Sequence, residues 1–128
     1  MKVLVCGSRD WDDCVLLFDE CGYHVHTYCS EVLQVTHEPV TVLHGDSGRA
    51  DLWAEAWAQT NSHQYKRFPA KWRENGVYDP QAGFERNSEM LTENPSLVIA
   101  FQKGNSRGTQ DTIDKARALG IETHVITA

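Results

Sequence analysis

Three glycine-containing segments each follow a short apolar run, and their residue types suit the binding of a phosphate group. The segments are Gly7-Ser8-Arg9, Gly45-Asp46-Ser47-Gly48 and Gly104-Asn105-Ser106-Arg107-Gly108-Thr109. Glycine lets a phosphate approach the backbone closely, and backbone N–H groups and side-chain hydroxyls supply hydrogen-bond donors. One such loop is commonly a plain turn, but three of them in 128 residues predict an anion-binding site.

The basic residues agree with this prediction. Seven of the twelve Lys and Arg residues lie in or beside the loop segments, namely Arg9, Arg49, Lys71, Arg73, Arg86, Lys103 and Arg107. The chain as a whole carries a net charge of −6. An acidic protein that gathers its cations in this way is suited to a small anionic ligand, whereas an extended nucleic-acid contact usually needs a basic face. The alternative is that many of these side chains, Lys71 and Lys103 first, are simply solvated.

Four tryptophans have two interpretations. Trp11 and Trp72 lie near the predicted loops, where an indole could stack on a base or cover a small core. Trp53 and Trp57 are four residues apart in a predicted helix, a spacing that favours core packing. Trp53, Trp57 and Tyr65 could equally form the interface of a homodimer.

The cysteines predict neither disulfides nor a metal site. Cys14 and Cys21 fall on one apolar face of a predicted helix and are interpreted as small core residues. Cys21, His24, His26 and Cys29 lie close together, but their spacing fits no common zinc pattern. The sequence shows neither a signal peptide nor an apolar run long enough to span a membrane, so we expect a cytoplasmic protein, in the host if a phage encodes it.

The loops need a scaffold, and the hydrophobic pattern supplies one. Strands are expected at residues 2–6, 40–43, 63–68, 97–101 and 121–126, and helices at 14–32, 50–59, 84–91 and 109–119. An alternative reading breaks the first helix at Gly22 and makes residues 23–27 a strand. Residues 69–83 show no regular pattern. Alternating strands and helices predict one α/β domain over residues 1–128, a parallel sheet of about five strands with helices on both faces. Ligands then bind beyond the carboxyl ends of the strands.

Five segments together resemble a known family. They are VLVCGSRDW, HGDSGRADLWAEAWA, FPAKW, ERNSEM and AFQKGNSRGT, in this order along almost the whole chain. The set is similar to the YspA-type, cpYpsA-related branch of the SLOG superfamily, which also includes the DNA-processing protein DprA and the Lonely Guy phosphoribohydrolases. The resemblance implies a Rossmann-like fold that binds nucleotides or nucleotide-derived signals.

The phosphoribohydrolases use an arginine and a glutamate, and only the arginine has a counterpart here. Arg86 matches it, with Asn87 where those enzymes have lysine. Gly108 and Thr109 match their Gly-Thr pair, but Thr112 stands at the glutamate position. Threonine cannot act as a carboxylic acid or base near neutral pH. The resemblance therefore leaves it uncertain whether the protein is an enzyme, and the missing glutamate favours a protein without enzymatic activity. Arg86 and Asp111 are catalytic candidates only if the protein is an enzyme, with Asp46 and Asp51 as further substitute acids.

The favoured function is the sensing or sequestration of a nucleotide-like small molecule, with no cofactor required. The ligand-binding residues predicted from loops and resemblance are Gly7, Ser8, Arg9, Gly45, Asp46, Ser47, Gly48, Trp72, Arg86, Asn87, Gly104, Ser106, Arg107, Gly108 and Thr109. Hydrolysis of a nucleotide or an N-glycosidic bond is the first alternative. Single-stranded DNA binding, by analogy with DprA, is the second and is disfavoured by the net charge of −6.

Overall fold

The structure is a computed structural model, and it describes residues 1–9, 11, 23–33, 38–74 and 76–127. The strands are β1 (Lys2–Gly7), β2 (Thr41–His44), β3 (Gln64–Arg67), β4 (Arg73–Glu74), β5 (Val77–Tyr78), β6 (Leu97–Gln102) and β7 (Glu122–Thr127). The helices are α1 (Tyr23–Leu33), α2 (Arg49–Thr60), α3 (Ala82–Leu91) and α4 (Arg107–Ala118). Apart from the added strands β4 and β5, the elements follow one another in the predicted order.

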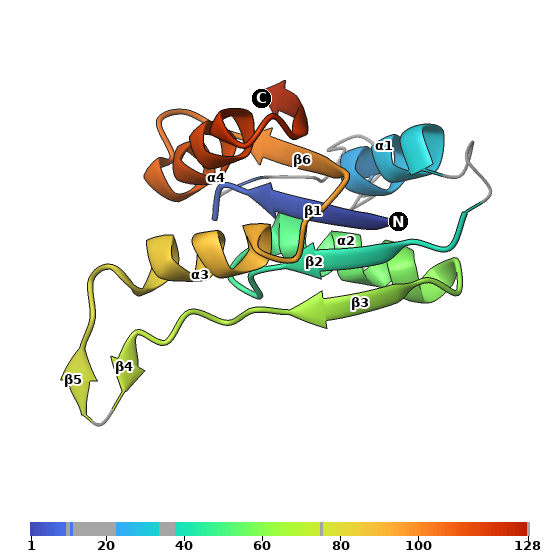
Figure 1. Cartoon of the computed structure of the whole chain (residues 1–128). Coiled ribbons are helices and arrows are strands. Elements are labelled where there is room, and N and C mark those ends of the chain that lie inside the picture. The colour runs from blue at the N-terminus through green and yellow to red at the C-terminus, as the bar shows by residue number, and fades with distance from the viewer. Residues whose placement is uncertain (10, 12–22, 34–37, 75, 128) are drawn as a thin grey trace.

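Five strands form one parallel sheet in the order β3-β2-β1-β6-β7 (Figure 1). The chain starts in the middle at β1, runs outward through β2 to β3, and returns to the other side of β1 with β6. The direction of winding therefore reverses between β1 and β6, and the loops after these two strands diverge there. Such a reversal is where open α/β sheets bind ligands. The arrangement confirms the predicted Rossmann-like α/β fold.

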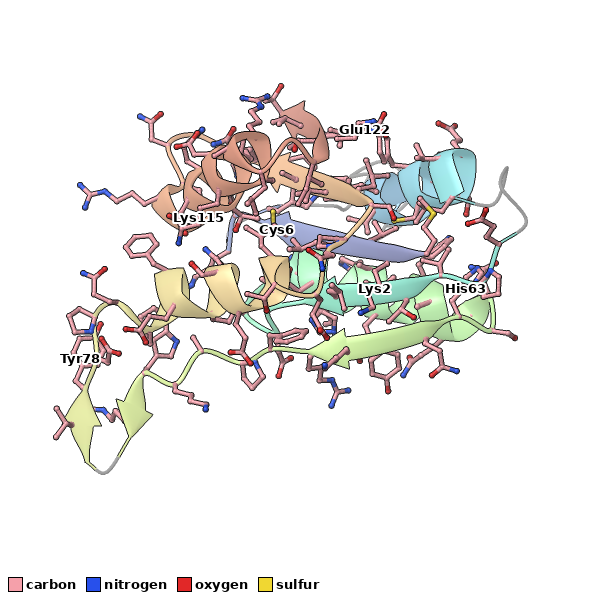
Figure 2. The ribbon with its side chains drawn as sticks, viewed as in Figure 1. Lys2, Cys6, His63, Tyr78, Lys115 and Glu122 are labelled. Atoms are coloured by element: carbon pink, nitrogen blue, oxygen red, sulfur yellow. The ribbon has the colours of Figure 1, made fainter. Side chains whose placement is uncertain are left out.

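Helices α1 and α2 cover one face of the sheet and helices α3 and α4 cover the other (Figure 1). Alternate residues along a strand point to opposite faces. Val3 and Val5 of β1 pack in the cluster that includes α1 and α2, whereas Leu4 and Cys6 pack in the cluster that includes α3 and α4. In Figure 2 the labelled side chains of Cys6 and Lys115 are seen on the α3 and α4 side. This double coverage explains why β1 reads as an unbroken apolar run.

Two expectations need correction. Residues 23–27 belong to helix α1, so the alternative strand there is wrong. The part of the predicted long helix before Tyr23, with Cys14 and Cys21, lies outside the described residues. Residues 69–83 are not without structure, because β4 and β5 form an antiparallel hairpin that projects from the body beside α3 (Figure 1). Tyr78 lies on this hairpin (Figure 2).

The tryptophans divide between core and surface. Trp11 is 3% exposed and packs against the Phe101 ring with the centroids 5.3 Å apart, so it belongs to the core and is not available to stack on a ligand. Trp57 is fully buried and donates from Nε1 to Ser30 Oγ at 3.0 Å, and Trp53 packs partly buried against the same core. Core packing of Trp53 and Trp57 is confirmed.

Candidate functional site

A cleft of about 630 Å³ opens at the carboxyl ends of β1 and β6, where the sheet reverses direction. Its floor includes Cys6, Gly7 and Thr112. Gly45 and Ser47 border it from the β2–α2 turn and Asp51 from the first turn of α2. On the other side it is bordered by residues 103–106 of the β6–α4 turn and by Gly108 and Thr109 of the first turn of α4. The amino-terminal half of α3 and Trp72 form the outer wall. The volume lies within the range of small-molecule sites, roughly 300–1,000 Å³.

The amino end of α4 has neither a side-chain cap nor an acidic residue in its first turn. Ser106 is the N-cap residue, but its side chain does not cap the helix and instead donates from Oγ to Thr109 Oγ1 at 3.0 Å. The first N–H groups of a helix have no intrahelical acceptor, and the helix dipole makes this end positive. Gly104 has a φ of +63°, which turns the chain in a conformation that glycine adopts without strain.

The amino end of α2 differs because it already holds a carboxyl group. Asp51, in the first turn of α2, accepts at Oδ2 from the Ser47 backbone N–H at 3.1 Å and from Ser47 Oγ at 3.4 Å. Asp51 is only 5% exposed, and it lines the cleft. An anionic group of a ligand is therefore less favoured at this end of the cleft than at α4.

Arg86 connects the turn after β2 with α3. Its Nη1 donates to the carbonyl oxygens of Gly45 at 2.6 Å and Phe68 at 3.3 Å, and its Nε donates to Asn87 Oδ1 at 3.0 Å. Within the described chain, Nη2 has no hydrogen-bond partner and no carboxylate lies within 4 Å of the guanidinium. Burial lowers the pKa of Arg86, although the nearby Asp51 acts in the opposite direction. A ligand anion would offset the cost of burying this cation.

Asn87 extends the connection from α3 to α4. Its Nδ2 donates to the Gly108 carbonyl at 3.1 Å and to Asp111 Oδ2 at 3.2 Å, and the residue is 3% exposed. Oδ1 of Asn87 accepts from Arg86, so both the oxygen and the nitrogen of the side-chain amide are hydrogen-bonded. Asn87 therefore holds the Arg86 side chain and the first turn of α4 in fixed positions relative to one another.

Two glycine-loop residues serve packing. Ser8 is 1% exposed; its Oγ accepts from the Lys103 backbone N–H at 2.9 Å and lies 3.3 Å from the Lys103 carbonyl, which fastens the loops after β1 and β6 together. A Cβ on Gly7 would lie 2.5 Å from the Ala50 Cβ and 3.0 Å from the Phe101 carbonyl oxygen. Gly7 is thus required for α2 to approach the sheet closely.

Trp72 lies on the outer wall. A Cβ on Gly83 would lie 3.0 Å from its ring, the Arg9 guanidinium carbon lies 5.5 Å above the ring centroid, and the Tyr78 ring stacks at 6.3 Å. These contacts hold the indole at the base of the hairpin. Trp72 therefore borders the cleft with an aromatic surface, together with Phe84 and Pro80.

The structure brings together most of the predicted ligand-binding residues but not all. Those that line the cleft are Gly7, Arg9, Gly45, Ser47, Trp72, Arg86, Asn87, Gly104, Ser106, Gly108 and Thr109. Ser8, Asp46, Gly48 and Arg107 do not line it; Asp46 and Arg107 are exposed to solvent. Lining residues that neither the loops nor the resemblance indicated include Cys6, Gly83, Phe84 and Met90. Lys103 and Asn105 also line the cleft; they lie in or beside the third predicted loop but were not among the predicted ligand-binding residues. Gly83 could have been found, because it lies three residues before Arg86 and therefore on the same face of α3.

The structure distinguishes the aspartates that were considered as catalytic acids by their position relative to the cleft. Asp111 pairs with Lys115 Nζ at 2.8 Å, accepts from Asn87, and does not line the cleft. Thr112 lines the floor and is 1% exposed. Cys6 also lies on the floor, where burial raises the pKa of its thiol well above the ordinary value, so the thiol stays protonated at neutral pH. Of the aspartates considered, Asp51 is the one that borders the cleft.

The described residues contain no group of three or more His, Cys, Asp or Glu side chains that could hold a metal ion. The side chains of His24 and His26, and Cys21, are outside that description. No helix in the part of the chain that the structure describes is long and apolar enough to cross a membrane.

The family model of the YspA, cpYpsA-related SLOG family matches residues 1–74, which is more than half of the chain. The chain belongs to this family. The match extends from β1 to β4 and contains the loops after β1 and β2, so the cleft is built partly from family residues. Membership is consistent with a nucleotide-related function. The chain is also similar to the Gene 61 protein of Mycobacterium phage D29, with 29% identity over 125 residues that cover 94% of this chain and 91% of that protein.

Proposed function

We propose that the cleft binds a nucleoside monophosphate or a related nucleotide-derived molecule, for sensing or sequestration, with the phosphate at the amino end of α4. The observation that carries the proposal is the uncapped first turn of α4, which opens into a cleft that also contains Arg9, Arg86 and Lys103. Backbone N–H groups at a helix amino end and guanidinium groups are the donors that phosphate prefers. The net charge of −6 favours a small anion over an extended polyanion as the ligand.

The rest of the cleft suits the rest of such a molecule. Trp72, Phe84 and Pro80 provide an apolar wall on which a planar base can pack. Binding is favoured over hydrolysis because Thr112 stands where the Lonely Guy phosphoribohydrolases have their glutamate, and Asp111 is engaged with Lys115 outside the cleft.

The test is to compare ligands that differ in one part. Calorimetry on the purified protein should detect binding of AMP, ribose 5-phosphate and inorganic phosphate, whereas adenosine should bind at least tenfold more weakly than AMP. Native mass spectrometry of protein purified from cells should show a co-purifying phosphorylated compound. Equal affinity for adenosine and AMP would contradict the proposal. Release of free base from AMP would instead support the hydrolase alternative.

A further inference from the structure

Two buried carboxyl groups lie one turn apart on α2, and their surroundings differ. Glu55 is 6% exposed and accepts hydrogen bonds from Arg67 Nε at 2.6 Å and Nη2 at 2.9 Å; it also contacts His44 Nε2 at 2.9 Å. These contacts, the Arg67 hydrogen bond first, lower the pKa of Glu55 to about 2. Glu55 is therefore a fully paired structural carboxylate that faces away from the cleft.

Asp51 is buried to the same extent but lacks a comparable partner. Both of its hydrogen bonds come from Ser47 and involve Oδ2, while Oδ1 has no partner among the described residues. No Lys, Arg or His nitrogen of the described chain lies within 4 Å of it. Burial raises the pKa of Asp51, while the Ser47 hydrogen bonds and the charges of His44 and Arg86 act to lower it.

A buried polar atom without a partner is uncommon in folded proteins, because it loses hydration without compensation. Asp51 lines the cleft, so a molecule in the cleft can supply the missing hydrogen bond. The partner cannot be a phosphate, since a second anion beside this carboxyl group would be repelled. The ligand proposed above carries its charge on the phosphate, so the group that reaches Asp51 is a neutral one. A hydroxyl can donate to Oδ1, and a hydrogen bond to a charged acceptor is stronger than the one that an asparagine amide would form.

We propose that Asp51 Oδ1 forms a hydrogen bond with a sugar hydroxyl of the ligand and so distinguishes a phosphorylated sugar from phosphate alone. The inference rests on the proposed phosphate position at α4, and it fixes the direction in which the ligand lies. The anionic end contacts α4, and the sugar hydroxyls face the first turn of α2 across the ends of β1 and β6.

The experiment compares ribose 5-phosphate with inorganic phosphate, so that the unknown base plays no part. The variant is Asp51→Asn, which keeps the side-chain size and an oxygen for the Ser47 hydrogen bond. The control is Asp114→Asn, the same chemical change at an exposed position of α4 outside the cleft. Calorimetry on the parent should give tighter binding of ribose 5-phosphate than of phosphate. Asp51→Asn should weaken ribose 5-phosphate about tenfold and change phosphate binding by less than about twofold.

The outcomes separate the two proposals. If the parent binds neither compound, the phosphate position at α4 is wrong and this inference falls with it. If the parent binds both and Asp51→Asn changes neither affinity, only the role of Asp51 is contradicted. If Asp51→Asn weakens both compounds equally, Asp51 shapes the cleft but does not contact a hydroxyl. Thermal unfolding of each variant shows whether the fold is retained.

Discussion

The Nη1 atom of Arg86 lies 2.6 Å from the carbonyl oxygen of Gly45, a residue 41 positions earlier in the chain. This hydrogen bond ties the turn after β2 to α3 and aims the guanidinium into the cleft. A guanidinium at this position on α3 has two obvious kinds of partner, a ligand or a nearby carboxylate of Glu85, Glu89 or Asp111. The structure shows a third arrangement, in which backbone carbonyls use Nη1 and leave Nη2 available within the described chain.

Arg86→Lys should weaken ligand binding strongly. One ammonium group cannot keep both carbonyl contacts and also donate to the phosphate, as Nη2 of the guanidinium can. We expect AMP affinity to fall at least tenfold, with a loss of about 1 kcal/mol in the free energy of unfolding. Arg117→Ala, an exposed change on α4, serves as the control and should alter neither quantity. Calorimetry and urea unfolding measure the two effects, and unchanged affinity in Arg86→Lys would place the ligand elsewhere.

Gly45→Ala should act on the same guanidinium without changing its charge. A Cβ at position 45 would collide with Nη1 and Cζ of Arg86, so the side chain must move and its hydrogen bond to the Gly45 carbonyl is lost. We expect weaker AMP binding in a protein that still folds, because the obstructed group is the end of a flexible side chain. A crystal structure of the variant with Arg86 in its present position would contradict this expectation.

Glu55→Gln should lower stability in a pH-dependent manner. The pKa of Glu55 in the fold is about 2, below its ordinary 4.5, so the ionised group stabilises the fold above pH 4.5 and loses this effect as pH falls toward 2. Since the Arg67 side chain is 52% exposed and screened by water, we expect a difference of about 1–2 kcal/mol at pH 7. Urea unfolding of parent and variant at pH 7 and pH 3 should show the difference shrinking. A constant difference would mean that packing, not charge, is involved.

Asp51→Asn should have the opposite effect on stability. Burial raises the pKa of Asp51 above its ordinary 3.8, so the ionised form costs stability as pH rises beyond that value. The asparagine variant should therefore be at least as stable as the parent at pH 7, as judged by the midpoint of urea unfolding. A loss of more than about 1 kcal/mol would show that the carboxylate is paired more strongly than its contacts with Ser47 indicate.

The sheet was predictable because its central strands β1, β2 and β6 are buried and read as apolar runs such as residues 97–101. The loops that meet at the cleft followed from this, since parallel strands end at the same edge. The roles of Asp51 and Glu55 were not predictable. Both lie on the inward face of α2, and only the position of Arg67, on β3, decides which one is paired. The role of Trp11 was not predictable either, because tryptophans in loops are found both in cores and at ligand sites.

The hairpin β4–β5 takes no part in the main sheet, and it adjoins the cleft only through Trp72 and Pro80 at its base. It is anchored through Trp72, whose carbonyl accepts from the Asp79 N–H at 2.7 Å, and the family match ends inside it at residue 74. Residues inserted at its turn would leave every hydrogen bond of the five-stranded sheet intact. The hairpin can therefore become longer or shorter during evolution at little risk to folding. Such changes would alter the surroundings of Trp72 and Pro80 at the cleft. We expect ligand preference among relatives to diverge here sooner than in the glycine-containing loops.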